Sequence, residues 1–243
     1  MSGKQIVVDN VSKSFGDLSV FDGVSFDVGD GEFVAIVGPS GCGKSTLLNV
    51  IAGFERPDRG TVTIDGAVRK GPNRNGIMIS QHGSVFPWLT VHQNLMFALS
   101  GTSYGDQAKL AHRYIDMVGL EGFEAAYPHE LSGGMLKRVE LARALVVKPE
   151  ILYMDEPFSA LDALMSLRMQ TELRRILDEE RHTVLLITHD VEEAIYLADR
   201  VLVLSPRPAR IQTTFLVDLP HPRKLSDPKA QGLREAILKE LGL

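Results

Sequence analysis

The chain has 243 residues, enough to bury one large hydrophobic core or two small ones, and its composition is ordinary for a globular protein. Its formal net charge of −5 argues against general nucleic-acid binding, which usually requires a basic surface. The single cysteine excludes a disulfide within the chain, no apolar run is long enough to cross a bilayer, and no signal-peptide pattern opens the sequence, so we expect a cytoplasmic protein.

Two short strands are predicted near the N-terminus, over residues 4–9 and 24–28, with turn-forming sequence between them. Phe15 is an aromatic residue within this otherwise polar stretch. On local sequence alone, a core position is the better interpretation of Phe15 than stacking on an adenine base.

The chain is organised around a glycine-rich segment that lies between a predicted buried strand, residues 33–37, and a predicted helix, residues 47–52. Its G-x-x-x-x-G-K-S spacing, with a strand before it and a helix after it, is that of a phosphate-binding loop. The loop consists of Gly38, Pro39, Ser40, Gly41, Cys42, Gly43, Lys44, Ser45 and Thr46.

The residue types of this loop suit a bound triphosphate. Glycines let successive backbone N–H groups converge on phosphate oxygens, and the N-terminus of the following helix adds a partial positive charge. Lys44 can reach the β- and γ-phosphates, and the Ser45 hydroxyl can bind Mg²⁺. Cys42 is interpreted as a small residue that the loop tolerates rather than as a redox switch.

The next predicted strands cover residues 61–66 and 76–80, and the second one delivers Gln81 at its carboxyl end. Ligands of open parallel sheets bind beyond the carboxyl ends of the strands. Gln81 is therefore placed to reach Mg²⁺ or an attacking water, although a surface glutamine fits the pattern equally well.

An apolar segment, residues 83–90, contains the only tryptophan of the chain, Trp88. Its proline argues against a regular element. Phe86, Trp88 and Leu89 indicate either a buried loop or a docking patch for a partner, and composition alone leaves both open.

Helical segments with no strand between them follow, which predicts a helical insertion in an alternating α/β chain. They cover residues 91–100, 107–118, 121–126 and 134–146. The last one opens with Ser132, Gly133 and Gly134, where Ser132 is a natural N-cap. Exposed N–H groups there could also bind an anion, but local sequence favours a simple cap.

A further apolar strand, starting at Glu150, ends in the paired acids Asp155 and Glu156. Because a phosphate loop precedes them, we expect Asp155 to hold Mg²⁺ through water and Glu156 to polarise a water against the γ-phosphate. His189 follows a further buried strand, residues 183–188, at the same sheet edge, so we favour a γ-phosphate contact for it. The other six histidines show no metal-ligand spacing.

The remaining predicted elements complete the alternating pattern. A long helix over about 161–180 has an apolar face that we interpret as core, formed by Leu161, Leu164, Leu167, Leu173, Ile176 and Leu177. A helix over 190–198 and a strand over 200–204 come next. From Ser205 the sequence becomes rich in proline and arginine and ends in a helix over about 228–241, too short for a separate regulatory domain.

In order and spacing, these pieces resemble the ATP-binding subunits of ABC transporters along nearly the whole chain. The loop matches the Walker A motif, Gln81 the Q-loop, and Ser132-Gly133-Gly134 the signature motif. Asp155 and Glu156 match Walker B with its catalytic glutamate, 159–162 the D-loop, and His189 the switch histidine. Phe15 lies where the family carries an aromatic that stacks on adenine, so the resemblance reverses the local interpretation of Phe15. The match with the signature motif likewise reverses the interpretation of Ser132, Gly133 and Gly134 as a simple cap.

Two signature residues depart from the common pattern, because Met135 and Lys137 stand where glutamine is frequent. The segments 86–91, 204–211 and 218–223 resemble the nitrate/sulfonate/taurine type of importer, which serves several small anions and some vitamin precursors. Nothing in the chain names the substrate.

The resemblance implies an α/β fold with a P-loop NTPase (RecA-like) core, an N-terminal antiparallel β subdomain and an inserted α-helical subdomain. We expect one ABC ATPase domain over residues 1–243, with the helical subdomain at about 91–146 and a short C-terminal extension at about 205–243. The resemblance also implies an ATP hydrolase that uses ATP and Mg²⁺, in which Gln81, Glu156 and His189 are catalytic.

The implied partners are a second copy, with which the chain forms a homodimer, transmembrane permease subunits that dock near residues 82–91, and indirectly a solute-binding protein. No nucleic-acid partner is expected. The protein is expected at the cytoplasmic face of the membrane. The alternatives are a lipid-transport ATPase and a soluble ABC ATPase of DNA repair or translation. The compact single cassette and the acidic charge argue against the soluble class.

Overall fold

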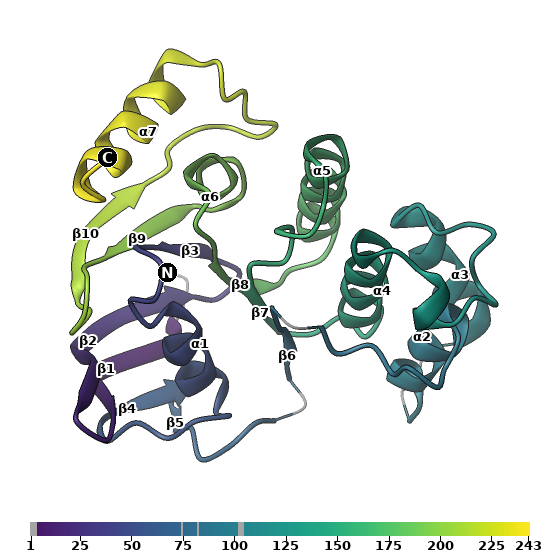
Figure 1. Cartoon of the computed structure of the whole chain (residues 1–243), viewed down its shortest axis with the longest axis horizontal. Coiled ribbons are helices and arrows are strands. Elements are labelled where there is room, and N and C mark those ends of the chain that lie inside the picture. The colour runs from purple at the N-terminus through teal and green to yellow at the C-terminus, as the bar shows by residue number, and fades with distance from the viewer. Residues whose placement is uncertain (1–3, 74, 82, 102–104) are drawn as a thin grey trace. The chain divides into compact units, whose positions relative to one another are not determined.

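The computed structural model describes residues 4–73, 75–81, 83–101 and 105–243 (Figure 1). The chain divides into two compact units. The first contains residues 1–76, 151–155 and 182–243, and the second contains residues 77–150 and 156–181. Within the described ranges, no helix is both long and apolar enough to cross a membrane.

The first unit begins with an antiparallel sheet in the order β2-β1-β4-β5. Its strands are β1 (Lys4–Phe15), β2 (Leu18–Gly29), β4 (Arg59–Ile64) and β5 (Ala67–Val68). The first two strands are longer than predicted, because the pairing shifts register around Asn10 and Gly23, which have φ of 49° and 69°. Such bulges absorb turn-forming residues without ending a strand.

A second sheet follows the order β10-β9-β3-β8-β7-β6. Its strands are β3 (Phe33–Val37), β6 (Gly76–Ile79), β7 (Ile151–Asp155), β8 (Thr183–Ile187), β9 (Arg200–Leu204) and β10 (Ile211–Leu216). The pairs β3–β8, β3–β9 and β7–β8 are parallel, whereas β10 runs antiparallel to β9. Every residue of β3, β7 and β8 is buried, as expected for parallel strands that are covered on both faces.

Helices cover this second sheet within the first unit. Helix α1 (Lys44–Ala52) contacts β7 and β8, and α6 (Val191–Leu197) contacts β3. Figure 1 shows α1 and α6 on opposite sides of these strands. Helix α7 (Pro228–Glu240) packs against α6 and β10. The predicted α/β fold with an N-terminal antiparallel sheet is confirmed.

The second unit is helical. It contains α2 (Val91–Leu99), α3 (Gln107–Met117), α4 (Gly133–Leu145), α5 (Ala163–Glu179) and the 3-10 helix η1 (Pro128–Glu130). Helices α2, α3 and α4 pack on one another. The predicted helix over 121–126 is wrong. Gly122 has a φ of 86° there, which turns the chain out of a helical path.

The interpretation of the α5 face as core is wrong for its first half. Leu173 and Ile176 are buried, but Leu164 is 78% exposed and Leu167 is 51% exposed. Leu161 and Leu177 are partly exposed. Helical periodicity predicts that one face is apolar, but it does not predict whether another element covers that face along its whole length.

A pair of histidines in the helical unit makes its stability depend on pH. The rings of His92 and His112 have centroids 5.0 Å apart. Burial lowers the pKa of His92, the neighbouring His112 lowers it further, and Glu124 opposes the shift. Because this pKa is lower in the folded chain, the unfolded chain takes up a proton first. The contribution of neutral His92 to the free energy of unfolding is therefore fully present above about pH 6.5, and it is lost as the pH falls through the pKa of His92 in the folded chain.

We expect the melting temperature to fall between pH 7.5 and pH 5.5, and His92→Gln to reduce this fall by about 1–2 °C, a small effect because water reaches the pair. Thermal unfolding at the two pH values measures it. His129→Gln, at an exposed position, is the control. An identical pH dependence in the two variants would contradict the assignment to His92.

Candidate active site

The phosphate loop lies tightly against two strands of the first unit. Gly43 precedes α1 with a φ of 112°, and a Cβ atom there would lie 2.3 Å from Cγ1 of Val20 in β2. A Cβ on Gly38 would lie 3.1 Å from Cβ of Leu204 in β9. Close packing therefore requires glycine at position 43 and leaves little room for a Cβ at position 38, which local sequence could not reveal because Val20 and Leu204 are remote in sequence.

Helix α1 begins at Lys44, three residues before its predicted start. Lys44, Ser45 and Thr46 thus form its first turn, whose N–H groups have no partner within a helix and point at the loop. Lys44 is buried, and its ammonium donates hydrogen bonds to the carbonyl oxygens of Gly38 at 2.8 Å and Pro39 at 3.1 Å. The geometry suits the binding of a phosphate chain.

Cys42 is buried within the loop. Burial raises the pKa of its thiol, against the smaller effect of Lys44. A buried, protonated thiol is a poor nucleophile, which favours the interpretation as a small tolerated residue over a redox switch.

Two predicted site residues lie at the sheet edge from which the phosphate loop emerges. Asp155 is the buried last residue of β7, and it pairs in register with Ile187 of β8, which in turn pairs with Ile36 of β3. The exposed His189 follows two residues after Ile187. Because these neighbouring strands are parallel, Asp155, His189 and the phosphate loop all follow carboxyl ends of strands on one edge.

Glu156 and Gln81 lie together in the second unit. The Nε2 atom of Gln81 donates a long hydrogen bond of 3.5 Å to Oε2 of Glu156. Glu156 has a φ of 48°, a left-handed conformation that is uncommon for a residue other than glycine and costs about 1–2 kcal/mol. Backbone strain of this kind concentrates at functional sites, and here it falls on the residue predicted to be the catalytic base.

The predicted signature residues form the start of α4. The Ser132 side chain is its N-cap and accepts a hydrogen bond from the Met135 N–H at 3.3 Å. Ser132 and Gly133 are exposed, and Gly134 is partly exposed. The capping role is therefore shown, and an anion-binding role of Ser132, Gly133 and Gly134 stays a prediction.

Phe15 ends β1 with its ring 51% exposed. Its local interpretation as a core residue is therefore wrong, and the stacking role that the family resemblance implies stays a prediction. The Lys13 ammonium lies 5.1 Å from the ring centroid.

The candidate magnesium ligands are all oxygen donors: the Ser45 hydroxyl, the Asp155 carboxylate and the Gln81 amide oxygen. Across the described residues, no group of three or more histidine, cysteine, aspartate or glutamate side chains forms a metal cage. This donor set fits Mg²⁺, which usually takes only one or two protein carboxylates and completes its shell with water and phosphate oxygens.

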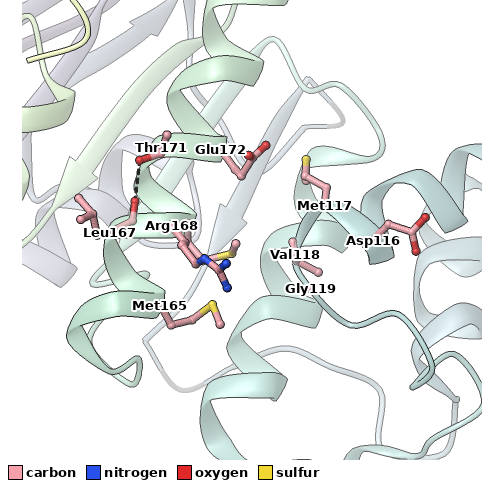
Figure 2. A pocket seen from close by; sticks show the side chains of 10 residues that line it. Asp116, Met117, Val118, Gly119, Met165, Leu167, Arg168, Thr171 and Glu172 are labelled. Carbon is pink, nitrogen blue, oxygen red and sulfur yellow. Dashed lines mark hydrogen bonds between the residues drawn. The ribbon is translucent and has the colours of Figure 1, made fainter.

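A cavity of about 490 Å³ lies elsewhere in the second unit, between the end of α3 and the first half of α5 (Figure 2). Met117 and Met165 line it, together with the exposed Leu167. Figure 2 also shows the hydrogen bond of 2.8 Å that the Thr171 hydroxyl donates to the Leu167 carbonyl oxygen. None of the predicted site residues lines this cavity, so the phosphate loop remains the candidate active site.

Comparisons with known proteins identify the family to which the chain belongs. Residues 21–159 match the ABC transporter family. The chain is 43% identical to an uncharacterized ABC transporter ATP-binding protein of Methanocaldococcus jannaschii, over 98% of this chain and 91% of the relative. It is 44% identical to the aliphatic sulfonates import ATP-binding protein SsuB of Bacillus licheniformis, over 94% of this chain and 91% of the relative.

The bicarbonate transport ATP-binding protein CmpC of Synechocystis is 40% identical over 96% of this chain and 37% of its own length. Among solved structures, a dimeric ATP-binding cassette in a post-hydrolysis state with ADP and Pi superposes with a TM-score of 0.77 and 29% identity. That match covers 88% of this chain and all of the cassette.

Proposed function

The chain belongs to the ABC transporter family of ATP-binding subunits and is an ATP hydrolase, and we propose that it powers the import of a small anion through a membrane permease. The observation that carries this proposal is the match with an aliphatic sulfonates import ATP-binding protein along nearly the full length of both chains. The motif residues expected to touch ATP or Mg²⁺ are present in this sequence.

The catalytic roles follow from the chemistry of each residue. The phosphate loop with Lys44 holds the triphosphate, and Phe15 stacks on the adenine. Ser45, Gln81 and Asp155 would supply the oxygen ligands of Mg²⁺, and the ion would neutralise charge on the phosphate oxygens. Glu156 orients or deprotonates the attacking water, and His189 contacts the γ-phosphate.

The chain carries both a phosphate loop and a signature motif, so two copies can form two complete sites. We propose a homodimer in which Ser132, Gly133 and Gly134 of one copy close over the γ-phosphate that the other copy holds. Two similar solved cassettes are described as dimeric. We treat residues 1–243 as a single ATPase domain, with the helical subdomain at about 91–146 and the C-terminal extension at about 205–243.

The aromatic segment before α2 supports permease docking. Trp88 is 69% exposed, and the Phe86 ring lies 5.5 Å from Trp88 and 4.7 Å from Phe97 between centroids. The buried Asn94 side chain holds this segment by hydrogen bonds to the carbonyl oxygens of Phe86, Leu89 and Thr90. An exposed aromatic cluster on a well-held loop fits a docking patch better than a buried loop. His82, the first residue of the proposed docking segment, lies outside the described residues.

Trp88→Ala is expected to weaken assembly with the permease at least tenfold while the ATPase rate of the isolated chain changes less than twofold, because the exposed ring adds little to the fold. Co-purification from membranes and phosphate release measure the two effects. Phe123→Ala replaces another exposed aromatic of the same unit and is the matched control. Loss of soluble, folded protein in the Trp88 variant alone would restore the buried-loop interpretation.

The proposed place is the cytoplasmic face of the membrane, bound to transmembrane subunits that receive the solute from a binding protein. The names of two relatives, an aliphatic sulfonates import protein and a bicarbonate transport protein, support the anionic substrate class. Ligand-binding measurements on the solute-binding protein that works with the permease test this class. Tight binding of a lipid would favour the lipid-transport alternative, and sulfonate or bicarbonate binding supports the proposal.

A further inference from the structure

Helix α4 carries a buried ion pair that the family resemblance does not explain. Lys137 is 5% exposed, Glu140 is 2% exposed, and the Lys137 ammonium lies 2.9 Å from Oε2 of Glu140. The same ammonium donates a second hydrogen bond, of 2.5 Å, to the carbonyl oxygen of Ser80. Ser80 directly precedes Gln81, so this side chain holds the backbone of the residue next to a proposed catalytic one.

The second oxygen of Glu140 reaches the other side of Gln81. The Ser84 hydroxyl donates a hydrogen bond of 2.9 Å to Oε1 of Glu140, and Arg143 donates one of 2.5 Å to the Ser84 hydroxyl oxygen. The Arg143 guanidinium lies 4.8 Å from the centroid of the Phe86 ring. Side chains of α4 therefore contact the chain on both sides of Gln81, at Ser80 and Ser84, and also at Phe86 in the aromatic segment.

Stability alone does not account for this arrangement. Removing two charges from water is costly, and a hydrophobic pair of similar volume is often as stable as a buried ion pair. What the pair does provide is directional contact, because each group has a fixed hydrogen-bond partner on the segment that carries Gln81. These interactions all lie within the second unit, which also holds Glu156 and its contact with Gln81.

We propose that Lys137 and Glu140 are positioning residues that hold residues 80–84 so that Gln81 stays beside Glu156. The proposal rests on the catalytic role proposed for Gln81. The lysine at position 137, where glutamine is frequent, is then paired with the acidic residue at position 140. Together the two side chains connect α4 to residues 80–84.

The test is the double variant Lys137→Met/Glu140→Leu, measured as purified chain without a permease, so that it does not depend on the importer proposal. We expect kcat for ATP hydrolysis to fall at least tenfold, with KM and the melting temperature close to those of the parent. Amide hydrogen exchange over residues 80–86 should speed up. The control is Lys148→Met/Glu180→Leu, which removes another ion pair of the same unit whose residues are remote from Gln81 in sequence.

A milder variant guards against loss of folding. Ser84 is exposed, so Ser84→Ala should leave the melting temperature unchanged and lower kcat about threefold. Ser84→Thr keeps the hydroxyl and should have the kcat of the parent. Gln81→Ala separates the two layers of the argument. If Gln81→Ala retains kcat, the catalytic role of Gln81 fails. If Gln81→Ala loses kcat but both the double variant and Ser84→Ala retain it, the positioning role fails.

Discussion

Replacing Glu156 with glutamine is expected to abolish nearly all ATP turnover while ATP binding persists. Glutamine keeps the size of the side chain and a partner for Gln81, but its amide cannot accept a proton from water. The loss expected for a general base is about 10²–10⁴-fold in kcat. The left-handed backbone at this position is already occupied by a residue with a Cβ, so the substitution adds no new strain.

Phosphate release and equilibrium dialysis with ATP measure the two halves of this expectation. Glu172→Gln, at a partly exposed position of α5 in the same unit, is the matched control and should retain turnover. Hydrolysis at the parental rate in the Glu156 variant would remove Glu156 from the proposed mechanism, and loss of ATP binding would show instead that it holds the nucleotide.

Replacing Gly43 with alanine is expected to remove nucleotide binding by displacing the phosphate loop. The new Cβ would lie 2.3 Å from Cγ1 of Val20, far inside van der Waals contact, and Val20 is buried in β2. The φ of 112° also disfavours any residue with a Cβ. Overpacking and backbone strain together should cost about 2–4 kcal/mol of folding free energy, and the loop should relieve this by moving. We expect ATP affinity to fall at least about 100-fold, because the loop supplies many of the contacts to phosphate.

Two further variants separate the clash from the strain. Gly66→Ala has a comparable φ of 77° but no heavy atom within 4 Å of the new Cβ, so it should retain ATP affinity and lose only about 1 kcal/mol. Val20→Ala in the Gly43→Ala background removes the clash and should recover part of the affinity. Titration with ATP and thermal unfolding report both effects. Parental affinity in Gly43→Ala would mean that the loop does not need its close contact with β2.

The elements around the phosphate loop could be predicted within a few residues because each reason is local. Apolar runs between turn residues predict β3, β7, β8 and β9, and those strands have to be buried on both faces. The lengths of β1 and β2 depend on register shifts between strands, which no single segment encodes. The uncovered first half of α5 was missed for the same reason, since coverage depends on other elements.

In the candidate site, too, local features could be predicted from the sequence and contacts between remote segments could not. Motif spacing predicts which residues can touch phosphate and magnesium, because each motif combines residue types that the chemistry requires. Contacts between remote segments are not visible in any motif. Val20 packs against Gly43 from another sheet, and Lys137 reaches the Ser80 carbonyl across 57 positions of sequence. These contacts follow from the fold.

The most direct test of the importer assignment is co-purification of the tagged Glu156→Gln chain from detergent-solubilised membranes in the presence of ATP. This variant should keep ATP bound and the dimer closed, so the complex with its partner should survive purification. We predict that a permease with several membrane-spanning segments co-purifies with it. Recovery of the chain alone, or with ribosomes or DNA, would contradict the importer assignment and favour a soluble ATPase.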